Sequence, residues 1–181
     1  MKGRDEALRL LKEAELICDA ECVEREVARI AREITAKLGE RFPVILSVMG
    51  GAAIFTGQLL PQLAFPLEFG AIEVTRYNND IEGREITWRL PPRDNVRGRT
   101  VLVVDDILDE GITLAAIHKT LLQMGAQEVF SAVFADKEIG RDKPVTADFV
   151  GVKVPNRYVF GFGMDAYGLW RNLPAIYALK Q

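Results

Sequence analysis

VLVVDDILDEGITL, residues 101–114, opens as an unbroken apolar run and closes in an acidic turn that contains a glycine. Consecutive aliphatic residues are typical of a strand covered on both faces, as in a parallel sheet. A helical pattern follows from about Thr113 to Met124, and Gly125 is its stop signal. Because ligands of open parallel sheets bind where strand ends meet helix starts, this turn is the first candidate for a binding site.

Working outward, short apolar runs alternate with helical patterns along the whole chain. Helices are expected over about 23–39, over a stretch that runs towards Leu60 and is closed by Pro61, and over about 113–124; strands are expected at 44–48, 67–77, 84–90, 100–104 and 129–135, followed by two or three short ones. This alternation predicts an α/β fold with a mostly parallel, twisted sheet flanked by helices on both faces.

Length and charge limit the classes of function. A chain of 181 residues, about half of them apolar, is expected to form a single domain. Its 23 basic and 26 acidic residues give a net charge of −3, which argues against a general nucleic-acid binder. No signal peptide and no apolar run of membrane-spanning length is recognised, so we expect no membrane partner and a cytoplasmic location.

The residues of the acidic turn suggest which ligand it binds. Backbone N–H groups at a helix start favour phosphate, so residues 109–113 are expected to hold one, with the Thr113 hydroxyl as an additional donor. Asp105 and Asp106 would repel a phosphate unless they bind sugar hydroxyls or magnesium. The alternative is that these carboxylates only cap the helix, but four acidic residues within six positions argue against it.

The same segment resembles the phosphoribosyl-pyrophosphate signature of the type I phosphoribosyltransferases. The resemblance implies that Asp105 and Asp106 face the ribose hydroxyls, directly or through Mg2+. It also implies that the loop Asp109-Glu110-Gly111-Ile112-Thr113 holds the 5′-phosphate. The fold of that family implies a core of about 40–136 and a small hood formed by the N- and C-terminal segments, about 1–22 and 137–181.

A second segment is similar to the hypoxanthine-guanine branch of that family. It is DFVGVKVPNRYVFGFGMDAYGLWRNLP, residues 148–174. By this resemblance Tyr158 stacks on the purine, Val159 meets the base edge, Asp165 approaches magnesium, and Arg171 approaches pyrophosphate.

Lys137, at the end of the strand expected at 129–135, matches the lysine that donates to the purine 6-oxo group. Taken alone, each of these residues also fits an ordinary role in the core or on the surface. Their order and spacing relative to the acidic turn favour a purine site.

The pyrophosphate side departs from the family pattern. Met49-Gly50 stands where relatives often carry a basic residue before a glycine pair, and Arg76-Tyr77 replaces a Ser-Tyr pair. We expect all four residues to bind phosphoribosyl pyrophosphate, with Arg76 restoring some of the missing charge. The segment from Arg76 to Gly83 is expected to be a lid that excludes water.

These features predict a magnesium-dependent enzyme that joins a 6-oxopurine to phosphoribosyl pyrophosphate, with Asp109 as the general base. A xanthine-preferring enzyme, one for adenine or a pyrimidine, and a non-catalytic sensor of phosphoribosyl pyrophosphate remain as alternatives. A sensor that regulates nucleic acids is expected to carry a basic surface, which this composition lacks. The resemblance also implies a homodimer or homotetramer.

We expect no part in the chemistry for the two cysteines and the single histidine. Cys18 and Cys22 stand four apart in what looks like a helix, and two thiols are half of a structural zinc site, so reduced thiols are expected. His118 is expected to serve at the surface or in packing.

Overall fold

A computed structural model describes residues 3–76 and 86–180. The helices are α1 (Arg4–Glu13), α2 (Ala20–Leu38), α3 (Ala53–Leu59) and α4 (Ile112–Gln123), with short 3-10 turns η1 (Leu60–Gln62) and η2 (Asp94–Val96). The strands are β1 (Glu15–Cys18), β2 (Val44–Met49), β3 (Glu68–Arg76), β4 (Ile86–Leu90), β5 (Thr100–Leu108), β6 (Glu128–Glu138), β7 (Phe149–Pro155), β8 (Val159–Phe160) and β9 (Ile176–Ala178).

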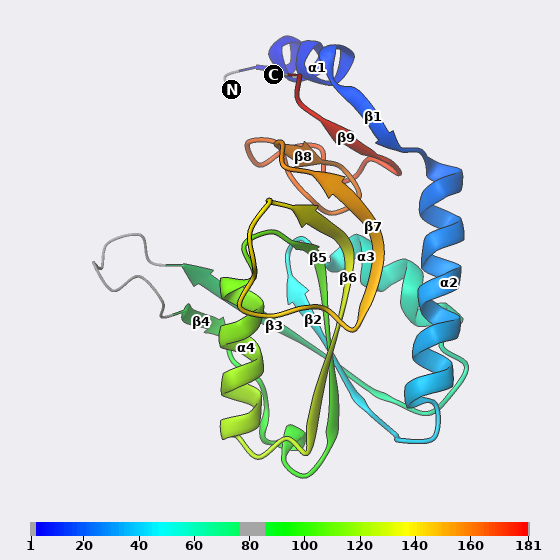
Figure 1. Cartoon of the computed structure of the whole chain (residues 1–181), viewed down its shortest axis with the longest axis vertical. Helices are drawn as coiled ribbons and strands as arrows, with labels where there is room; N and C mark the ends of the chain where they lie inside the picture. The colour runs from blue at the N-terminus through cyan, green and yellow to red at the C-terminus, as the bar shows by residue number, and fades with distance from the viewer. Residues whose placement is uncertain (1–2, 77–85, 181) are drawn as a thin grey trace.

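Six strands form the main sheet in the order β4-β3-β2-β5-β6-β7 (Figure 1). All neighbours are parallel except β3 and β4. The predicted mostly parallel α/β fold is therefore confirmed. The sheet extends further along the chain than the expected core of about 40–136, because β7 joins its edge beside β6.

Helices cover both faces of this sheet, as predicted. Successive side chains of a strand point to opposite faces, and β5 shows this clearly. Leu102 and Val104 pack in one cluster with buried residues of α2 and α3, whereas Val101 and Val103 pack in the other with residues of α4. In Figure 1, α2 and α4 accordingly lie on opposite sides of the sheet. Burial on both faces explains why β5 is an unbroken apolar run.

Local signals set where the two long helices begin. The Asp19 carboxylate accepts a hydrogen bond from the N–H of Cys22 at 2.8 Å, so α2 begins at Ala20, earlier than its apolar periodicity suggested. Gly111 precedes α4 with φ of 80°, a left-handed conformation that favours glycine. The acidic turn therefore leads directly into a helix, as the sequence predicted.

A second sheet forms a hood over the carboxyl end of the main sheet. Strands β1, β9 and β8 pair antiparallel, so segments from both ends of the chain build it, as expected for the hood. Both termini lie at this end of the molecule (Figure 1). Helix α1 is attached by Trp170, whose indole N–H donates to the carbonyl of Ala7 at 3.2 Å.

The expectation of reduced thiols is wrong in this structure, because Cys18 and Cys22 are joined by a disulfide. Cys18 ends β1 rather than lying in a helix, and the turn at Asp19 brings the two Cα atoms to 5.6 Å. That separation is within the usual range for a disulfide. The loop geometry that creates this proximity has no signature in the four-residue spacing.

His118 is half-buried in α4. Burial lowers the pKa of His118, against an opposing effect of Asp148, and its Nε2 is buried without a hydrogen-bond partner among the described residues. Within residues 3–76 and 86–180, no helix has the length and apolar character needed to cross a membrane.

Candidate active site

A pocket of about 240 Å³ lies between the carboxyl ends of β5 and β6 and the hood. Its walls combine acidic, basic, aromatic and aliphatic side chains from segments far apart in sequence: Asp106, Ile107, Asp109, Lys137, Tyr158, Val159, Met164 and Asp165. Six of these eight were singled out from the sequence. Ile107 and Met164 were missed because an aliphatic residue beside a motif reads as core.

An ion pair stands in this pocket. Lys137 Nζ lies 2.6 Å from Asp109 Oδ2, although the two residues are 28 positions apart. The lysine side chain is only 13% exposed, near the end of β6, and Asp109 follows β5 directly. Because β5 and β6 are parallel neighbours, their carboxyl ends deliver a cation and a carboxylate to one place.

Asp106 is an enclosed carboxylate of the turn, with a side chain 13% exposed against 41% for Asp109 and for Glu110. Burial raises the pKa of Asp106 above its ordinary value, although hydrogen bonding to the N–H of Ile107 and the nearby Arg171 act in the opposite direction. A Cβ atom at Gly51 would overlap this carboxylate. The second glycine after β2 therefore allows the backbone to approach Asp106 closely.

Arg171 bridges two of the predicted magnesium carboxylates. Its Nη2 lies 2.5 Å from Asp165 Oδ1, its Nη1 lies 3.9 Å from Asp106 Oδ2, and Nη1 also donates to the carbonyl of Gly163 at 2.6 Å. One guanidinium thus joins the end of β5 to the segment that follows β8. This arrangement sets a positive charge between carboxylates that would otherwise repel each other.

The predicted phosphate loop, residues 109–113, leads into α4 and includes the first two residues of that helix. The first turn of a helix presents N–H groups without partners inside the helix, and the helix dipole adds partial positive charge. A Cβ atom at Gly111 would meet the side chains of Lys143, Pro144 and Val145 at 3.3–3.4 Å. The loop is therefore held in place from the side by the connection between β6 and β7.

Two basic residues of that connection were not singled out from the sequence. Arg141 Nη2 lies 2.6 Å from Glu110 Oε1, so Glu110 of the phosphate loop is paired with a cation. Lys143 Nζ donates to the carbonyl of Leu108 at 2.7 Å and to Asp136 at 2.6 Å. Basic residues in a polar loop usually read as solvated surface, and only the fold brings these two to the turn.

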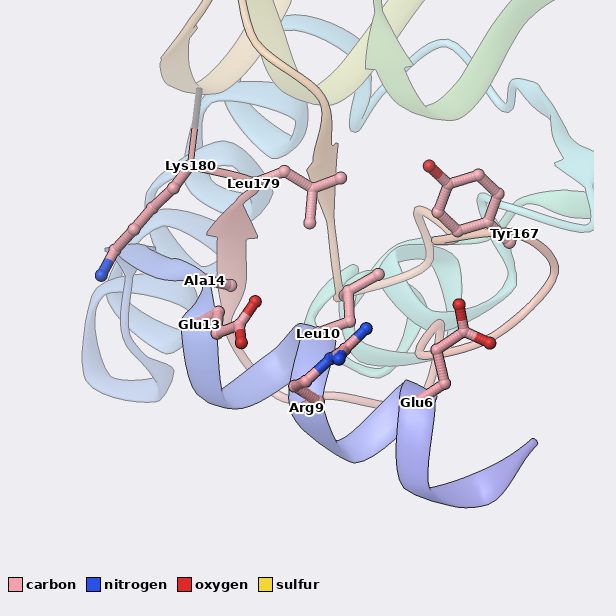
Figure 2. Close-up of a pocket in the computed structure, with 8 residues that line it drawn as sticks. All are labelled: Glu6, Arg9, Leu10, Glu13, Ala14, Tyr167, Leu179 and Lys180. Atoms are coloured by element: carbon pink, nitrogen blue, oxygen red, sulfur yellow. The ribbon is translucent and has the colours of Figure 1, made fainter. Parts of the chain in front are cut away.

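The aromatic wall is formed by Tyr158, which precedes β8, and Val159 lies next to it in the same pocket. The ring of Tyr158 stacks on that of Tyr167, with centroids 5.8 Å apart and planes inclined by 15°. Tyr167 belongs to a second pocket of about 450 Å³ beneath α1, shown in Figure 2. That pocket is lined mainly by α1 and the C-terminal residues, including Leu10 and Leu179.

Asp105, Met49 and Gly50 do not line this pocket. Asp105 Oδ1 accepts a hydrogen bond from the N–H of Asp106 at 2.9 Å. Met49 ends β2 with a half-exposed side chain, and Gly50 follows it. The backbone of Arg76 ends β3, whereas Tyr77 and the expected lid up to Gly83 lie outside the described residues.

The donor set at this site is suited to a hard cation that retains other ligands. Carboxylate oxygens are the ligands that magnesium prefers. Within the described residues, however, no group of three or more acidic, histidine or cysteine side chains is placed to hold a metal ion. The arrangement fits magnesium bound by one or two carboxylates together with substrate phosphates, which is common for this ion.

Comparison with protein families and curated sequences gives a consistent result. Residues 14–167 match the model of the phosphoribosyl transferase domain. The chain is 31% identical over 166 residues to a hypoxanthine-guanine phosphoribosyltransferase of Bacillus subtilis, covering 91% of this chain and 92% of that protein. It is 33% identical over 162 residues to a hypoxanthine-guanine-xanthine phosphoribosyltransferase of Tritrichomonas foetus, covering 88% and 87%.

Solved structures agree with this. A hypoxanthine-guanine-xanthine phosphoribosyltransferase is similar with a TM-score of 0.84 and 29% identity, over 94% of this chain and 99% of the other. A hypoxanthine phosphoribosyltransferase of Trypanosoma cruzi is similar with a TM-score of 0.86 and 26% identity, over 93% and 97%.

Proposed function

Because the chain belongs to the phosphoribosyltransferase family, we propose that it is a purine-salvage enzyme that converts hypoxanthine or guanine to IMP or GMP. Phosphoribosyl pyrophosphate is the second substrate, and pyrophosphate is released. The observation that supports this most directly is the Lys137–Asp109 pair in a pocket walled by Tyr158. A lysine donor, a carboxylate base and an aromatic ring are the groups that a 6-oxopurine requires.

The spacing of the ion pair matches one edge of the purine. The 6-oxygen and N7 of a 6-oxopurine are neighbours on the same edge of the ring system. With 2.6 Å between Lys137 Nζ and Asp109 Oδ2, one bound base would meet a donor at its oxygen and a proton acceptor at N7. Asp109 takes the N7 proton while the purine ring nitrogen forms its bond to C1 of the ribose and the bond to pyrophosphate breaks.

The other proposed roles follow the position of each group. The loop 109–113 holds the 5′-phosphate, Asp105 and Asp106 face the ribose hydroxyls, and Arg171 serves the pyrophosphate. Magnesium, when bound by Asp165, Asp105 and Asp106 together with the substrate, supplies positive charge that favours departure of pyrophosphate. Arg171 already lies beside two of these carboxylates, which supports its placement there.

Discrimination between bases follows from the same lysine. An ammonium donates to the 6-oxygen of hypoxanthine or guanine, but the 6-amino group of adenine is itself a donor, so both groups would be left unpaired. Sites built to pair with a specific polar group reject the mismatched analogue by about four orders of magnitude. We therefore propose a strong preference for 6-oxopurines over adenine.

The deciding experiment is a turnover assay with phosphoribosyl pyrophosphate, magnesium, and each of hypoxanthine, guanine, xanthine and adenine. We expect activity with hypoxanthine or guanine and almost none with adenine. Lys137→Met should remove most of that activity while phosphoribosyl pyrophosphate binding, measured by calorimetry, stays nearly intact. Comparable kcat/KM values for adenine and hypoxanthine would contradict the assignment of Lys137.

Two alternatives are decided by the same assay. Xanthine stays open as a substrate, since the relative from Tritrichomonas foetus includes it in its name. A sensor without catalysis would bind phosphoribosyl pyrophosphate and turn over none of the four bases.

A homodimer or homotetramer and a cytoplasmic location remain predictions of the sequence.

A further inference from the structure

Tyr158 and Tyr167 are in contact with each other but line two different pockets. Tyr158 lines the pocket that contains Asp109 and Lys137, and Tyr167 does not. Tyr167 lines the pocket beneath α1, and Tyr158 does not (Figure 2). The two rings are stacked with their planes 15° apart, so Tyr158 connects the wall of the pocket that contains Asp109 and Lys137 to Tyr167.

Tyr167 occupies a backbone position that rarely suits such a side chain. Its φ is 54° and that of Gly168 is 83°, and Ala166 pairs with Leu169 across them. These angles describe a two-residue β-hairpin of type I′, in which Asn-Gly is the preferred sequence. A tyrosine with positive φ is strained, and strain observed at one residue points to a role for its side chain.

The hairpin is held on both sides by contacts that do not involve the tyrosine ring. The N–H of Gly168 donates to Asp165 Oδ2 at 2.7 Å, and Trp170 is bonded to Ala7 of α1. Tyr167 is nevertheless 61% exposed, and its ring stacks on that of Tyr158. The contacts that hold the hairpin therefore do not require this ring to be buried.

We propose that Tyr167 is a positioning residue that fixes the ring plane of Tyr158 for stacking on the purine. Tyr158 is 45% exposed, and a half-exposed ring without a backing partner samples several orientations. Stacking on Tyr167 restricts the orientations of the Tyr158 ring before the base binds, which lowers the entropic cost of binding. The inference rests on the proposed function, because it assigns Tyr158 to the purine.

The test compares three variants with the parent in steady-state assays using hypoxanthine or guanine. Tyr167→Leu should raise the KM for the base about three- to tenfold, the range expected for losing an aromatic pair, while kcat and the KM for phosphoribosyl pyrophosphate stay within about twofold. Tyr167→Phe keeps the ring and should behave as the parent. Leu169→Ala alters an exposed side chain of the same hairpin and serves as the control.

A fourth variant separates positioning from folding. Tyr167→Asn places a residue that favours positive φ in the turn, so the midpoint of thermal unfolding should stay the same or rise. The KM for the base should still increase as in Tyr167→Leu. A merely structural tyrosine would instead show a lower unfolding midpoint in Tyr167→Leu and an unchanged KM in Tyr167→Asn.

Two failures are distinguishable. If the parent is active and both the Leu and Asn variants keep its KM for the base, Tyr167 does not position Tyr158. If the parent turns over no 6-oxopurine, the proposed function fails, and this inference fails with it.

Discussion

At the scale of single residues, two cations of the site are each paired with a carboxylate of the site. Lys137 is paired with Asp109, and Arg171 with Asp165. Pairing reduces the repulsion among carboxylates and lowers the cost of holding charges in a partly buried pocket. A substrate that carries its own oxygen acceptor and phosphates would exchange these internal pairs for contacts with itself.

The proposed base is tested by Asp109→Asn. The amide keeps the shape of the side chain but has no basicity, so turnover should fall about a hundredfold or more, the range for losing a general base. Binding of phosphoribosyl pyrophosphate, measured by calorimetry, should remain. Single-turnover rates within about threefold of the parent would show that Asp109 is not the base.

Asp106 should make stability depend on pH in the absence of ligands. Because its pKa is raised in the folded state, the folded protein binds more protons than the unfolded chain between the two pKa values. Stability therefore falls as the pH rises through that range, and above it the buried carboxylate destabilises the fold.

We accordingly expect Asp106→Asn to raise the unfolding midpoint at pH 7 and to change it less at pH 3. Each kcal/mol corresponds to about 2–4 °C in a domain of this size. Thermal unfolding followed by circular dichroism at both pH values measures the difference, with Asp142→Asn, at an exposed position, as the control. A lower midpoint for Asp106→Asn at pH 7 would show that its carboxylate stabilises the free protein.

At the scale of elements, three chain segments meet at Asp106. The end of β5 carries the aspartate, Gly51 follows β2, and a Cβ atom at Gly163, after β8, would overlap the carbonyl of Gly51. Met49 lies two residues before Gly51, and Arg171 donates to the carbonyl of Gly163 at 2.6 Å, so each residue is close along the chain or by contact to this junction. We therefore expect Arg171 to compensate for the positive charge that Met49 lacks.

Arg171→Ala should raise the KM for phosphoribosyl pyrophosphate about ten- to hundredfold, the loss expected for hydrogen bonds to a charged group. Met49→Lys in the same background should recover part of that loss, because it restores a cation at the end of β2. Initial-rate kinetics at saturating base measure both effects. A KM unchanged in Arg171→Ala would remove Arg171 from the pyrophosphate site.

At the scale of the whole molecule, Arg157 joins the parts of the hood. Its guanidinium donates to the carbonyl of Leu179 at 3.1 and 2.7 Å and to Glu15 at 2.6 Å, and the side chain is 18% exposed. One residue thus links the C-terminal segment and β1 to the turn directly before Tyr158. Segments from both ends of the chain are therefore linked to the aromatic wall of the proposed purine pocket.

Arg157→Lys should weaken these links, since an ammonium cannot reproduce the planar fork of donors. We expect a loss of about 1–3 kcal/mol in the free energy of unfolding and a higher KM for the base. Affinity for phosphoribosyl pyrophosphate should change less than twofold by calorimetry, because the proposed phosphate loop follows β5 and Arg171 is held by Gly163 and Asp165 rather than by Arg157. Arg25→Lys, at an exposed position of α2, is the matched control, and equal losses for both substrates would refute a separate role of the hood.

The strands and helices of the main sheet were predictable because their signals are local. The apolar run before Asp105 reflects a strand that is buried on both faces. The spacing of apolar residues in α2 reflects a helix that is buried on one face. Helix α1 and strand β1 were not predicted element by element, because short segments gain their stability from long-range partners such as β9.

The α/β class and the acidic turn with its helix could be read from the chain, because strand ends and helix starts have local signals. Resemblance to a family added Lys137, Tyr158, Val159 and Asp165 to the two aspartates of the turn that line the pocket. Which charges meet depends on the fold. The pairing of Lys137 with Asp109, the support of Glu110 by Arg141 and the stacking of Tyr158 on Tyr167 depend on which strands are neighbours. Contacts between distant residues arise from sheet order and packing, and neither leaves a mark in local spacing.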